Sequence, residues 1–499
     1  MKLINHIKSL FIITLINIST IQFLSAQDFL PKKTQDRIID YLEFNEERYG
    51  IVGQSVAVLK NGKFIYSEAH GLASLELNVE ATDKTVYMLF SISKLFVNVT
   101  IMQLVESGKI ELDQTISHYL AGLPESWEKI TVRQAMNHVT GLPEYYARPN
   151  ITALPDYYEM PIYPTPKTAS AALQSVVNKA FEFETGRTNR YNQTNFLLLK
   201  MVIEKITGKT YLSVAKSRMI DKLNLKNIQY GGEYDIIQGR ARAYKSTPSG
   251  LKLNGPIDQP DYFIASASLN GNVIDMAKWL SALLNGQLIS NKTMQQMWQP
   301  QLLTDGAASA FASGWEHSKR DGIIAVGHGG GGRVDVRHFY RENDAETVSV
   351  IYFANGGKKN YQPRNITKDI ATIVEDGPQT KLLSLKQKMY KQLAKTNLKG
   401  ALRRYQTFVS DKNTSNLSTE RTINLLGYDV LYGIGANEAK PIFELNLDRY
   451  PNSANCHDSL AETYLILGER EKSRFHYSKA YQLEPSERVK NILADLQDN

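Results

Sequence analysis

Strand-like runs gather at the two ends of the segment 35–375 and leave its middle almost free of them. Two β-rich runs flank Asn61-Gly62, and three more occupy residues 323–355. Asn-Gly between such runs predicts a tight hairpin, and strands joined by short loops are antiparallel. Residues 115–300 carry mostly helical patterns. The simplest architecture is one antiparallel sheet built from both ends of the domain, flanked by helices and carrying an all-α insertion, which is an α+β fold.

The rest of the chain differs in composition. A chain of 499 residues is too long for one compact core, so two or three domains are expected. After about residue 376 a repeat appears that aligns Phe443 with Tyr477 and Pro451 with Pro485, a period of 34 residues. This resembles tetratricopeptide units, which are pairs of packed helices; two unrelated amphipathic helix pairs are the alternative. We expect residues 381–499 to form a helical repeat domain whose deletion leaves the preceding domain folded.

The N-terminus has the pattern of an export signal. Two lysines precede an apolar stretch, residues 10–24, and the small residues Ser25 and Ala26 follow. This predicts a secretory signal peptide over residues 1–26 and a periplasmic or secreted protein. A membrane anchor is the alternative, but the stretch is shorter than the roughly 20 apolar residues that a span needs. Cys456 is the only cysteine, so an exported chain could form no internal disulfide.

The charge balance is mildly basic. The formal net charge is +7, and removal of Lys2 and Lys8 with the signal peptide leaves +5. We find no contiguous run of lysine and arginine, so nucleic acid is not expected as a partner.

The spacing Ser-x-x-Lys occurs four times, but only Ser91 and Lys94 open a long amphipathic helical pattern, at residues 91–107, whose apolar residues recur every three or four positions. Residues three apart share a helix face, and the N–H groups at a helix start stabilise an oxyanion. Because burial disfavours the charged amine, a buried Lys94 could accept the Ser91 proton. The other matches, at Ser126, Ser213 and Ser249, lack such a helix.

Two further segments carry chemistry. Tyr191 stands before a helix predicted to begin near Thr194, where a phenolate could act as a base. On its own it is a weak signal, because the chain has 27 tyrosines. A run of glycines at 329–332 lies at the edge of a predicted strand. Glycine allows close backbone approach and suits a ligand that lies along the strand edge; a flexible hairpin loop is the alternative.

These three pieces, in this order, resemble the serine β-lactamase-related hydrolases, which include class C β-lactamases, D-alanyl-D-alanine carboxypeptidases and related esterases. Residues 91–94 match the family's Ser-x-x-Lys element and residues 191–193 its Tyr-x-Asn element. Residues 328–330 match its Lys-Thr-Gly element, which is His-x-Gly in many members. The resemblance covers roughly residues 35–375 of a predicted hydrolase domain at 27–376.

The resemblance implies an acyl-enzyme mechanism without a cofactor or metal. Ser91 would attack a carbonyl, and Lys94 and Tyr191 would share general-base and general-acid work. The backbone N–H groups of Ser91 and Gly331 would form the oxyanion hole. The residues expected to bind substrate or the oxyanion are Gln193, His328, Gly330, Gly331 and Arg333.

The sequence departs from the family pattern at three places. Gln193 replaces asparagine and is one methylene longer. His328 replaces lysine, so a fixed positive charge is lost near neutral pH. Arg333-Val334-Asp335 stands where Pro-Gly-Phe is customary, and Arg333 could hold a substrate carboxylate. The alternatives for Arg333 are a solvated strand arginine or a partner for Asp335. These departures weaken the case for β-lactamase activity more than for acyl transfer.

The leading hypothesis is therefore an exported serine hydrolase that acts on an ester, an amide or a D-amino-acid peptide. The alternative is a catalytically silent peptidoglycan- or peptide-binding module whose repeat tail recruits a protein partner. No His-Glu-x-x-His or Gly-x-Ser-x-Gly string is present, which disfavours metallohydrolases and α/β-hydrolases. Stable membrane insertion after signal removal is not expected.

Overall fold

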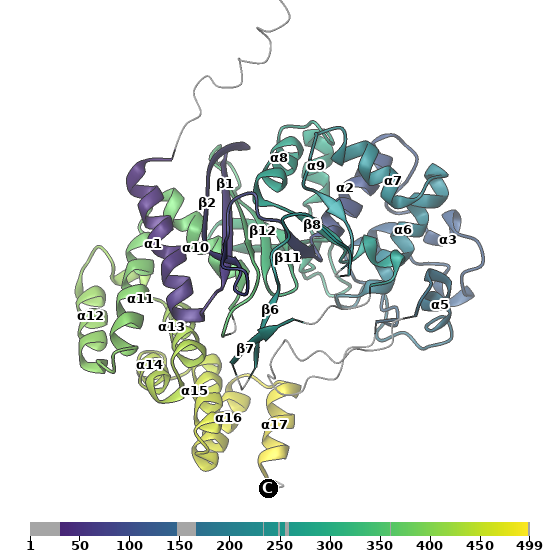
Figure 1. The fold of residues 1–499 in the computed structure, drawn as a ribbon. Coiled ribbons are helices and arrows are strands. Elements are labelled where there is room, and N and C mark those ends of the chain that lie inside the picture. The colour runs from purple at the N-terminus through teal and green to yellow at the C-terminus, as the bar shows by residue number, and fades with distance from the viewer. Residues whose placement is uncertain are drawn as a thin grey trace, which may run out of the picture.

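The computed structural model describes residues 30–146, 166–232, 234–247, 250–254, 259–359 and 361–497 (Figure 1). The predicted signal peptide at 1–26 and Ser249 lie outside these residues. Within them, no helix combines the length and apolar character needed to cross a membrane.

An eight-stranded antiparallel sheet forms the centre of the molecule. Its strand order is β3-β2-β1-β13-β12-β11-β10-β9, so β1 (Gly53–Lys60) pairs directly with β13 (Val348–Ala354). The sheet is thus assembled from both ends of the domain, as the sequence predicts. The other strands are β2 (Lys63–Ser74), β3 (Val79–Glu80), β9 (Phe311–Ala312), β10 (Trp315–Arg320), β11 (Ile323–Gly330) and β12 (Val334–Arg341).

The predicted hairpin at Asn61-Gly62 joins β1 to β2. Asn61 has φ 51° and Gly62 φ 73°, and positive φ at both central residues is the type I′ signature that matches strand twist. A register shift between Val58 and Leu59 marks a bulge in this pair.

The two faces of the sheet are covered by different helices. Val56 and Val58 share a core with α1 (Lys32–Tyr49) and α10 (Pro363–Glu375). Ala57 and Leu59 point the other way, into the core formed with α2 (Ser93–Glu106) and α8 (Val273–Leu284). This alternation is the period-two geometry of a strand, and it places α2 and α1 on opposite sides of the sheet (Figure 1).

The helix α2 differs from the amphipathic helix that the sequence predicts. It begins at Ser93, and every residue from there to Leu104 is buried. Two of its polar side chains donate to carbonyls inside the core: Thr100 Oγ1 to Phe96 at 2.8 Å, and Gln103 Nε2 to Leu288 at 3.1 Å. These side chains therefore do not mark a solvent face.

The segment between the two groups of strands is not purely helical. A small antiparallel sheet, β4-β8-β5, lies there, and β4 (Tyr87–Phe90) runs directly into α2. The remaining elements of this region are α3 (Ile116–Tyr119), α4 (Val132–Met136), α5 (Ala169–Gln174), α6 (Gln193–Thr207), α7 (Tyr211–Ala215), β5 (Gln229–Tyr230), β6 (Tyr244–Thr247), β7 (Gly250–Leu253), β8 (Leu269–Gly271) and α9 (Asn291–Met297).

The C-terminal tail is helical and docks on the first domain. Its helices α13 and α15 begin at residues 420 and 454, and α14 and α16 at 436 and 470, so both pairs repeat after 34 residues. Phe44 of α1 belongs to the same hydrophobic core as the tail helices, and α1 lies beside α11 and α13 in Figure 1. The tail comprises α11 (Gln379–Leu393), α12 (Leu398–Ser410), α13 (Glu420–Gly433), α14 (Ala436–Arg449), α15 (Ala454–Ile466), α16 (Arg470–Leu483) and α17 (Glu487–Gln497).

Candidate active site

A sharp turn between β4 and α2 presents Ser91. Phe90 has φ 47°, a left-handed conformation that is unfavourable for an aromatic residue. The carbonyl of Ser91 accepts a hydrogen bond from the Lys94 N–H at 3.0 Å, so Ser91 lies at the N-terminal end of the helix. The half-buried Ser91 hydroxyl is therefore held close to the positive end of a helix dipole.

The structure brings the three predicted catalytic side chains together. The Tyr191 hydroxyl donates to Ser91 Oγ at 2.8 Å. Lys94 is fully buried, and its Nζ lies 4.8 Å from the centre of the Tyr191 ring. The same amine donates to the carbonyl of Ser266 at 2.9 Å. A nucleophile, a phenol and an amine are thus in mutual reach, which is the arrangement that covalent catalysis by serine needs.

Tyr191 is held by a histidine that the sequence analysis did not select. His138 Nδ1 accepts a hydrogen bond from the Asn192 N–H at 3.1 Å, and its ring lies 4.7 Å from that of Tyr191. Asn192 in turn caps α6, where its side chain accepts from the Asn195 N–H. One buried imidazole and one cap therefore fix the backbone that carries the phenol.

The glycine run packs tightly against the turn before Ser91. A Cβ added to Gly330 would lie 2.3 Å from the carbonyl oxygen of Leu89, and one added to Gly331 would lie 2.5 Å from the Phe90 ring. Gly331 also has φ +53°, a region that favours glycine. The glycines are thus needed for close approach, which excludes the alternative of a flexible loop.

One edge of this strand end remains open. The pairing of β11 with β10 ends at Gly327 and Glu316, whereas the pairing with β12 continues to Gly330. Residues 328–330 therefore have a neighbouring strand on one side only, as the sequence analysis expects for a strand edge beside the site.

His328 is buried beside Tyr191, with ring centres 5.8 Å apart. Its Nδ1 lies 2.6 Å from the carbonyl oxygen of Gly329, so the neutral ring carries its proton on Nδ1. Burial lowers the pKa of His328 below its ordinary value; Glu316 opposes this effect and Lys94 adds to it. His328 is therefore neutral near pH 7, and its Nε2 is a buried acceptor without a hydrogen-bond partner among the described residues.

Comparison with known proteins assigns the chain to a protein family. The family model described as beta-lactamase matches residues 35–372. The chain belongs to the beta-lactamase family. This confirms the predicted resemblance and fold class, and it makes the protein a serine hydrolase at the level of the family.

Individual relatives of this beta-lactamase family member are distant. A teichoic acid D-alanine hydrolase of Staphylococcus aureus is 26% identical over 238 residues, which is 48% of this chain and 56% of that protein. The match therefore spans just over half the length of the curated relative.

Solved structures of the beta-lactamase family share the fold. The octameric penicillin-binding protein homologue from Pyrococcus abyssi has a TM-score of 0.56 and 21% identity, covering 68% of this chain and 77% of its own. The D-amino acid amidase from Ochrobactrum anthropi SV3 has a TM-score of 0.54 and 21% identity, covering 69% and 98%.

The first departure from the beta-lactamase family motif, Gln193, occupies the first residue of α6. Its backbone N–H donates to Glu144 Oε2 at 2.7 Å. The side chain is 6% exposed, and its Oε1 has no hydrogen-bond partner among the described residues. A buried amide oxygen without a protein donor is costly unless water or a ligand donates to it.

A buried ionic cluster, also missed by the sequence analysis, supports the strand that carries His328 in this beta-lactamase family member. Arg337 donates to Asp335 Oδ1 at 2.6 Å and to Glu316 Oε2 at 2.8 Å, and Thr367 donates to Asp335 Oδ2 at 2.6 Å. Burial opposes ionisation of Glu316, but Arg337 outweighs it and lowers the Glu316 pKa to about 2. Asp335 is thus engaged by Arg337 and Thr367.

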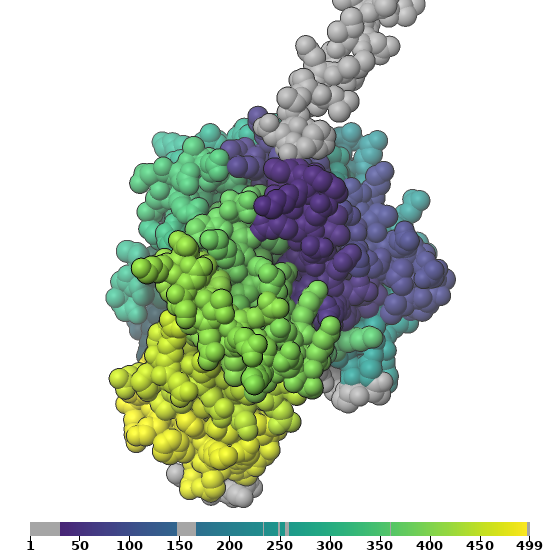
Figure 2. All heavy atoms as spheres, turned by 90° about the vertical axis from the view of Figure 1, so that its left-hand side faces the viewer, coloured from purple at the N-terminus to yellow at the C-terminus, as the bar shows by residue number. Residues whose placement is uncertain are grey.

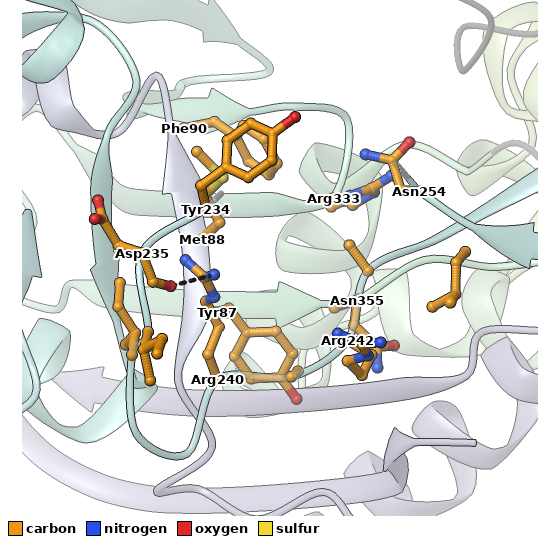
Figure 3. Close-up of a pocket in the computed structure, with 16 residues that line it drawn as sticks. Tyr87, Met88, Phe90, Tyr234, Asp235, Arg240, Arg242, Asn254, Arg333 and Asn355 are labelled. Atoms are coloured by element: carbon orange, nitrogen blue, oxygen red, sulfur yellow. Dashed lines mark hydrogen bonds between the residues drawn. The ribbon is translucent and has the colours of Figure 1, made fainter. Parts of the chain in front are cut away.

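The last predicted residue, Arg333, is not a solvated strand residue. It is 4% exposed and lines a cavity of about 580 Å³ that Phe90 also borders. Arg240 and Arg242 line the same cavity, and Figure 3 shows Arg333 and Arg242 along one side of it. The cavity therefore adjoins the turn that presents Ser91, and its charged lining of three arginines and Asp235 is net positive. Among the described residues, no cluster of three His, Cys, Asp or Glu side chains could hold a metal ion.

Proposed function

We propose that the protein hydrolyses a D-amino-acyl ester or amide through an acyl-enzyme on Ser91. The observation that carries the proposal is the 2.8 Å hydrogen bond between Tyr191 and Ser91 beside the buried Lys94. The D-amino-acyl class comes from the relative named a teichoic acid D-alanine hydrolase. The family assignment supports a serine nucleophile, and the relative suggests which acyl group it receives.

The proposed reaction proceeds in two acyl transfers. Ser91 Oγ bonds to the substrate carbonyl carbon while its proton passes to Tyr191 and on to Lys94. The N–H groups of Ser91 and Gly331 hold the oxyanion of the tetrahedral intermediate. The intermediate collapses by breaking the C–O or C–N bond, and the departing oxygen or nitrogen takes the proton. Water then attacks the acyl-enzyme by the same route, releases the acid and restores the Ser91 hydroxyl.

The unpartnered acceptors give His328 and Gln193 a role in binding. His328 Nε2 and Gln193 Oε1 are buried beside the catalytic trio and accept no hydrogen bond from the described residues. Both suit donors on the substrate, such as the ammonium group of an amino-acyl moiety or an amide N–H. In this proposal they position the acyl group and take no proton in the reaction, and the acyl group lies along the open strand edge at residues 328–330.

The cationic cavity supports an acidic group elsewhere on the substrate. Arg333 and Arg242 share one wall (Figure 3), and guanidinium groups bind carboxylate or phosphate with paired hydrogen bonds. Arg242→Gln and Arg333→Gln should each weaken kcat/KM for a D-alanyl substrate with a free carboxylate by 1.5–3 kcal/mol, about the strength of a charged hydrogen bond. The methyl ester of the same substrate should change little. Equal losses on both substrates in both variants would contradict the assignment.

The decisive experiment identifies the modified residue. The purified protein is treated with a fluorescent penicillin and, separately, with a fluorophosphonate, and the labelled peptide is read by mass spectrometry. We expect label on Ser91, and we expect Ser91→Ala to lose about four powers of ten in turnover of D-alanyl esters while the far-UV spectrum is unchanged. Turnover by Ser91→Ala near the wild-type rate would overturn the mechanism. Faster hydrolysis of the L-alanyl than the D-alanyl ester would overturn the substrate class.

Export is part of the same proposal. The pattern at residues 1–26 motivates it. N-terminal sequencing of the mature protein from cell fractions should find cleavage after Ala26 in the periplasmic or secreted fraction. An intact N-terminus on cytoplasmic protein would contradict export without affecting the proposed chemistry.

A further inference from the structure

The positive charge of the chain is concentrated in one helical hairpin. Residues 377–410 contain six lysines, two arginines and no acidic residue. Their formal charge of +8 compares with +7 for the whole chain, so the remaining residues together are close to neutral. The segment forms the antiparallel neighbours α11 and α12. A local excess of this size creates a strong positive field at the surface.

Most of these charges face solvent. Seven of the eight basic side chains are exposed, the exception being Lys386. Apart from Lys391, which lies 3.5 Å from Glu47, none of the seven makes an ion pair among the described residues. The exposed residues are Lys381, Lys388, Lys391, Lys395, Lys399, Arg403 and Arg404.

The charges are arranged over a surface rather than along a groove. Lys381 and Lys388 are seven residues apart and share one face of α11, and Lys395 lies in the turn that follows the end of this helix at Leu393. Lys399 and Arg403, four residues apart, lie on one face of the adjacent α12. Figure 2 looks toward this side of the molecule, where the light-green atoms of this region are open to solvent.

The large apolar side chains of this hairpin are buried or partly buried, most of them against the core of the tail. No large hydrophobic residue of 377–410, all of which the structure describes, is exposed. Of its aromatic residues, Tyr390 and Tyr405 are buried and Phe408 is partly buried against the tail core, so this segment presents no fully exposed aromatic ring on which bases or sugar rings could stack. Binding by the hairpin is therefore electrostatic, without insertion of side chains into an apolar phase.

The basic surface lies away from the catalytic serine. The tail helices pack on α1, which covers one face of the sheet, whereas Ser91 precedes α2 on the other face. In Figure 1, α11 and α12 lie at one end of the molecule and α2 and α6 at the opposite end. A ligand held by the hairpin is consequently remote from Ser91 and does not obstruct access to it.

We propose that α11 and α12 dock the protein on a bilayer that carries anionic lipids. A two-helix face of exposed lysine and arginine fits a planar anionic surface, and its distance from Ser91 leaves the active site free above that surface. Each basic residue close to an anionic membrane strengthens binding roughly fivefold. The interaction weakens at high salt, because these exposed charges are screened over about 8–10 Å at physiological ionic strength.

The test measures partition of the full chain onto vesicles by co-sedimentation. Vesicles of phosphatidylcholine alone are compared with vesicles that contain one third phosphatidylglycerol, and the readout is the ratio of the two partition coefficients. This ratio removes any contribution from the apolar residues 10–24, which every variant shares. The hairpin variant carries Lys388→Gln, Lys395→Gln, Lys399→Gln and Arg403→Gln.

A matched variant removes the same charge from the other end of the molecule. Its four substitutions, at exposed lysines without ion pairs among the described residues, are Lys109→Gln, Lys129→Gln, Lys179→Gln and Lys209→Gln.

The expected ratio for the wild type is well above one and falls at least 100-fold in the hairpin variant, with less than a threefold change in the matched variant. Hydrolysis of a small soluble ester should be equal in all three proteins. A wild-type ratio near one, or equal losses in both variants, would overturn the proposal. Tighter binding to soluble polyphosphate than to anionic vesicles would assign the surface to an anionic polymer and overturn the lipid assignment.

Discussion

Asp429→Ala should detach the repeat tail from the hydrolase domain. Asp429 in α13 lies 3.4 Å from Arg48 Nη1 and 3.4 Å from Lys386 Nζ, and it accepts a hydrogen bond from the Tyr49 hydroxyl at 3.0 Å. Arg48 is only 4% exposed. The carboxylate therefore neutralises a buried guanidinium at the junction between α1 and the tail.

The size of the effect follows from what remains after the substitution. Removing one partner of a buried ion pair costs about 3–5 kcal/mol, because the other charge stays buried without compensation. Arg48 keeps hydrogen bonds to Asn45 Oδ1 and Tyr41 Oη, and its guanidinium lies 4.3 Å from the Tyr49 ring centre. These contacts moderate the loss, so we expect about 3 kcal/mol. Asp429→Asn, which keeps the shape and one acceptor, should lose less.

The distribution of tryptophans provides the assay. All four tryptophans lie before residue 316, in the hydrolase domain, whereas far-UV circular dichroism also reports the tail helices. In urea, Asp429→Ala should show a dichroism transition that precedes the fluorescence transition, whereas the two transitions of the wild type should lie closer together.

Lys32→Ala is the control, because it removes only a solvent-exposed pair with Asp36 on the same helix α1 and should leave the free energy of unfolding nearly unchanged. A loss below 1 kcal/mol in Asp429→Ala, or superimposable transitions, would refute the reasoning.

The junction also predicts an acid dependence. Burial acts to raise the pKa of Asp429, but Lys386 and Arg48 outweigh it and hold the pKa below the ordinary value. A lowered folded-state pKa contributes stability above the unfolded-state pKa of about 3.9 and loses it as pH falls through the folded-state value. The free energies of unfolding of the wild type and of Asp429→Ala should therefore show their full difference at pH 7 and become equal as pH falls below about 4.

Three shorter predictions concern the site. Tyr191→Phe should lower kcat for D-alanyl esters by 10²–10⁴-fold with little change in KM, as steady-state kinetics would show; an unchanged kcat would remove Tyr191 from proton transfer. Gly331→Ala should lower kcat strongly, because the new methyl group meets the Phe90 ring and φ is positive, and wild-type activity would contradict the packing argument. Glu316→Gln should lower the free energy of unfolding by about 2 kcal/mol at pH 7. The difference between wild type and variant should vanish as pH falls from 4 toward 2, since Arg337 holds the Glu316 pKa at about 2. A constant difference across that pH range would contradict this prediction.

The parts of the fold that were predictable have local signatures. The turn at Asn61-Gly62 and the order of the three motifs depend on residues adjacent in sequence, and each predicted the element that the structure contains. The strands β5 and β8 were missed because two or three residues are too short to show an alternating pattern. The helix α2 was predicted as amphipathic because its apolar residues recur at three- or four-residue spacing. No sequence rule shows that polar side chains between them, such as Thr100 and Gln103, have partners inside the core.

The position of the tail had no sequence signature at all. Arg48 and Asp429 are 381 residues apart, and neither is unusual in its local segment. The prediction that a deletion from about residue 381 leaves the first domain folded rested on the autonomy of repeat arrays. The structure adds that such a deletion would expose Phe44 and leave Arg48 without Asp429, so we expect the isolated first domain to fold with reduced stability. The basic hairpin escaped notice for a related reason: its charges are spaced along helices and form no contiguous run.

The positions of the catalytic side chains depend on residues that belong to none of the three sequence motifs. Lys94 is fixed by burial and by the carbonyl of Ser266, and Tyr191 by the ring of His138. The sequence motifs specify which groups meet, but their distances are set by a fully buried helix and by glycines that let a turn press against Phe90. Since small displacements of reacting groups cost large factors in rate, substitutions at His138 should reduce kcat although this residue need not touch the substrate. The short motifs therefore specify the reacting groups of the family, whereas the packed core sets the distances between these groups.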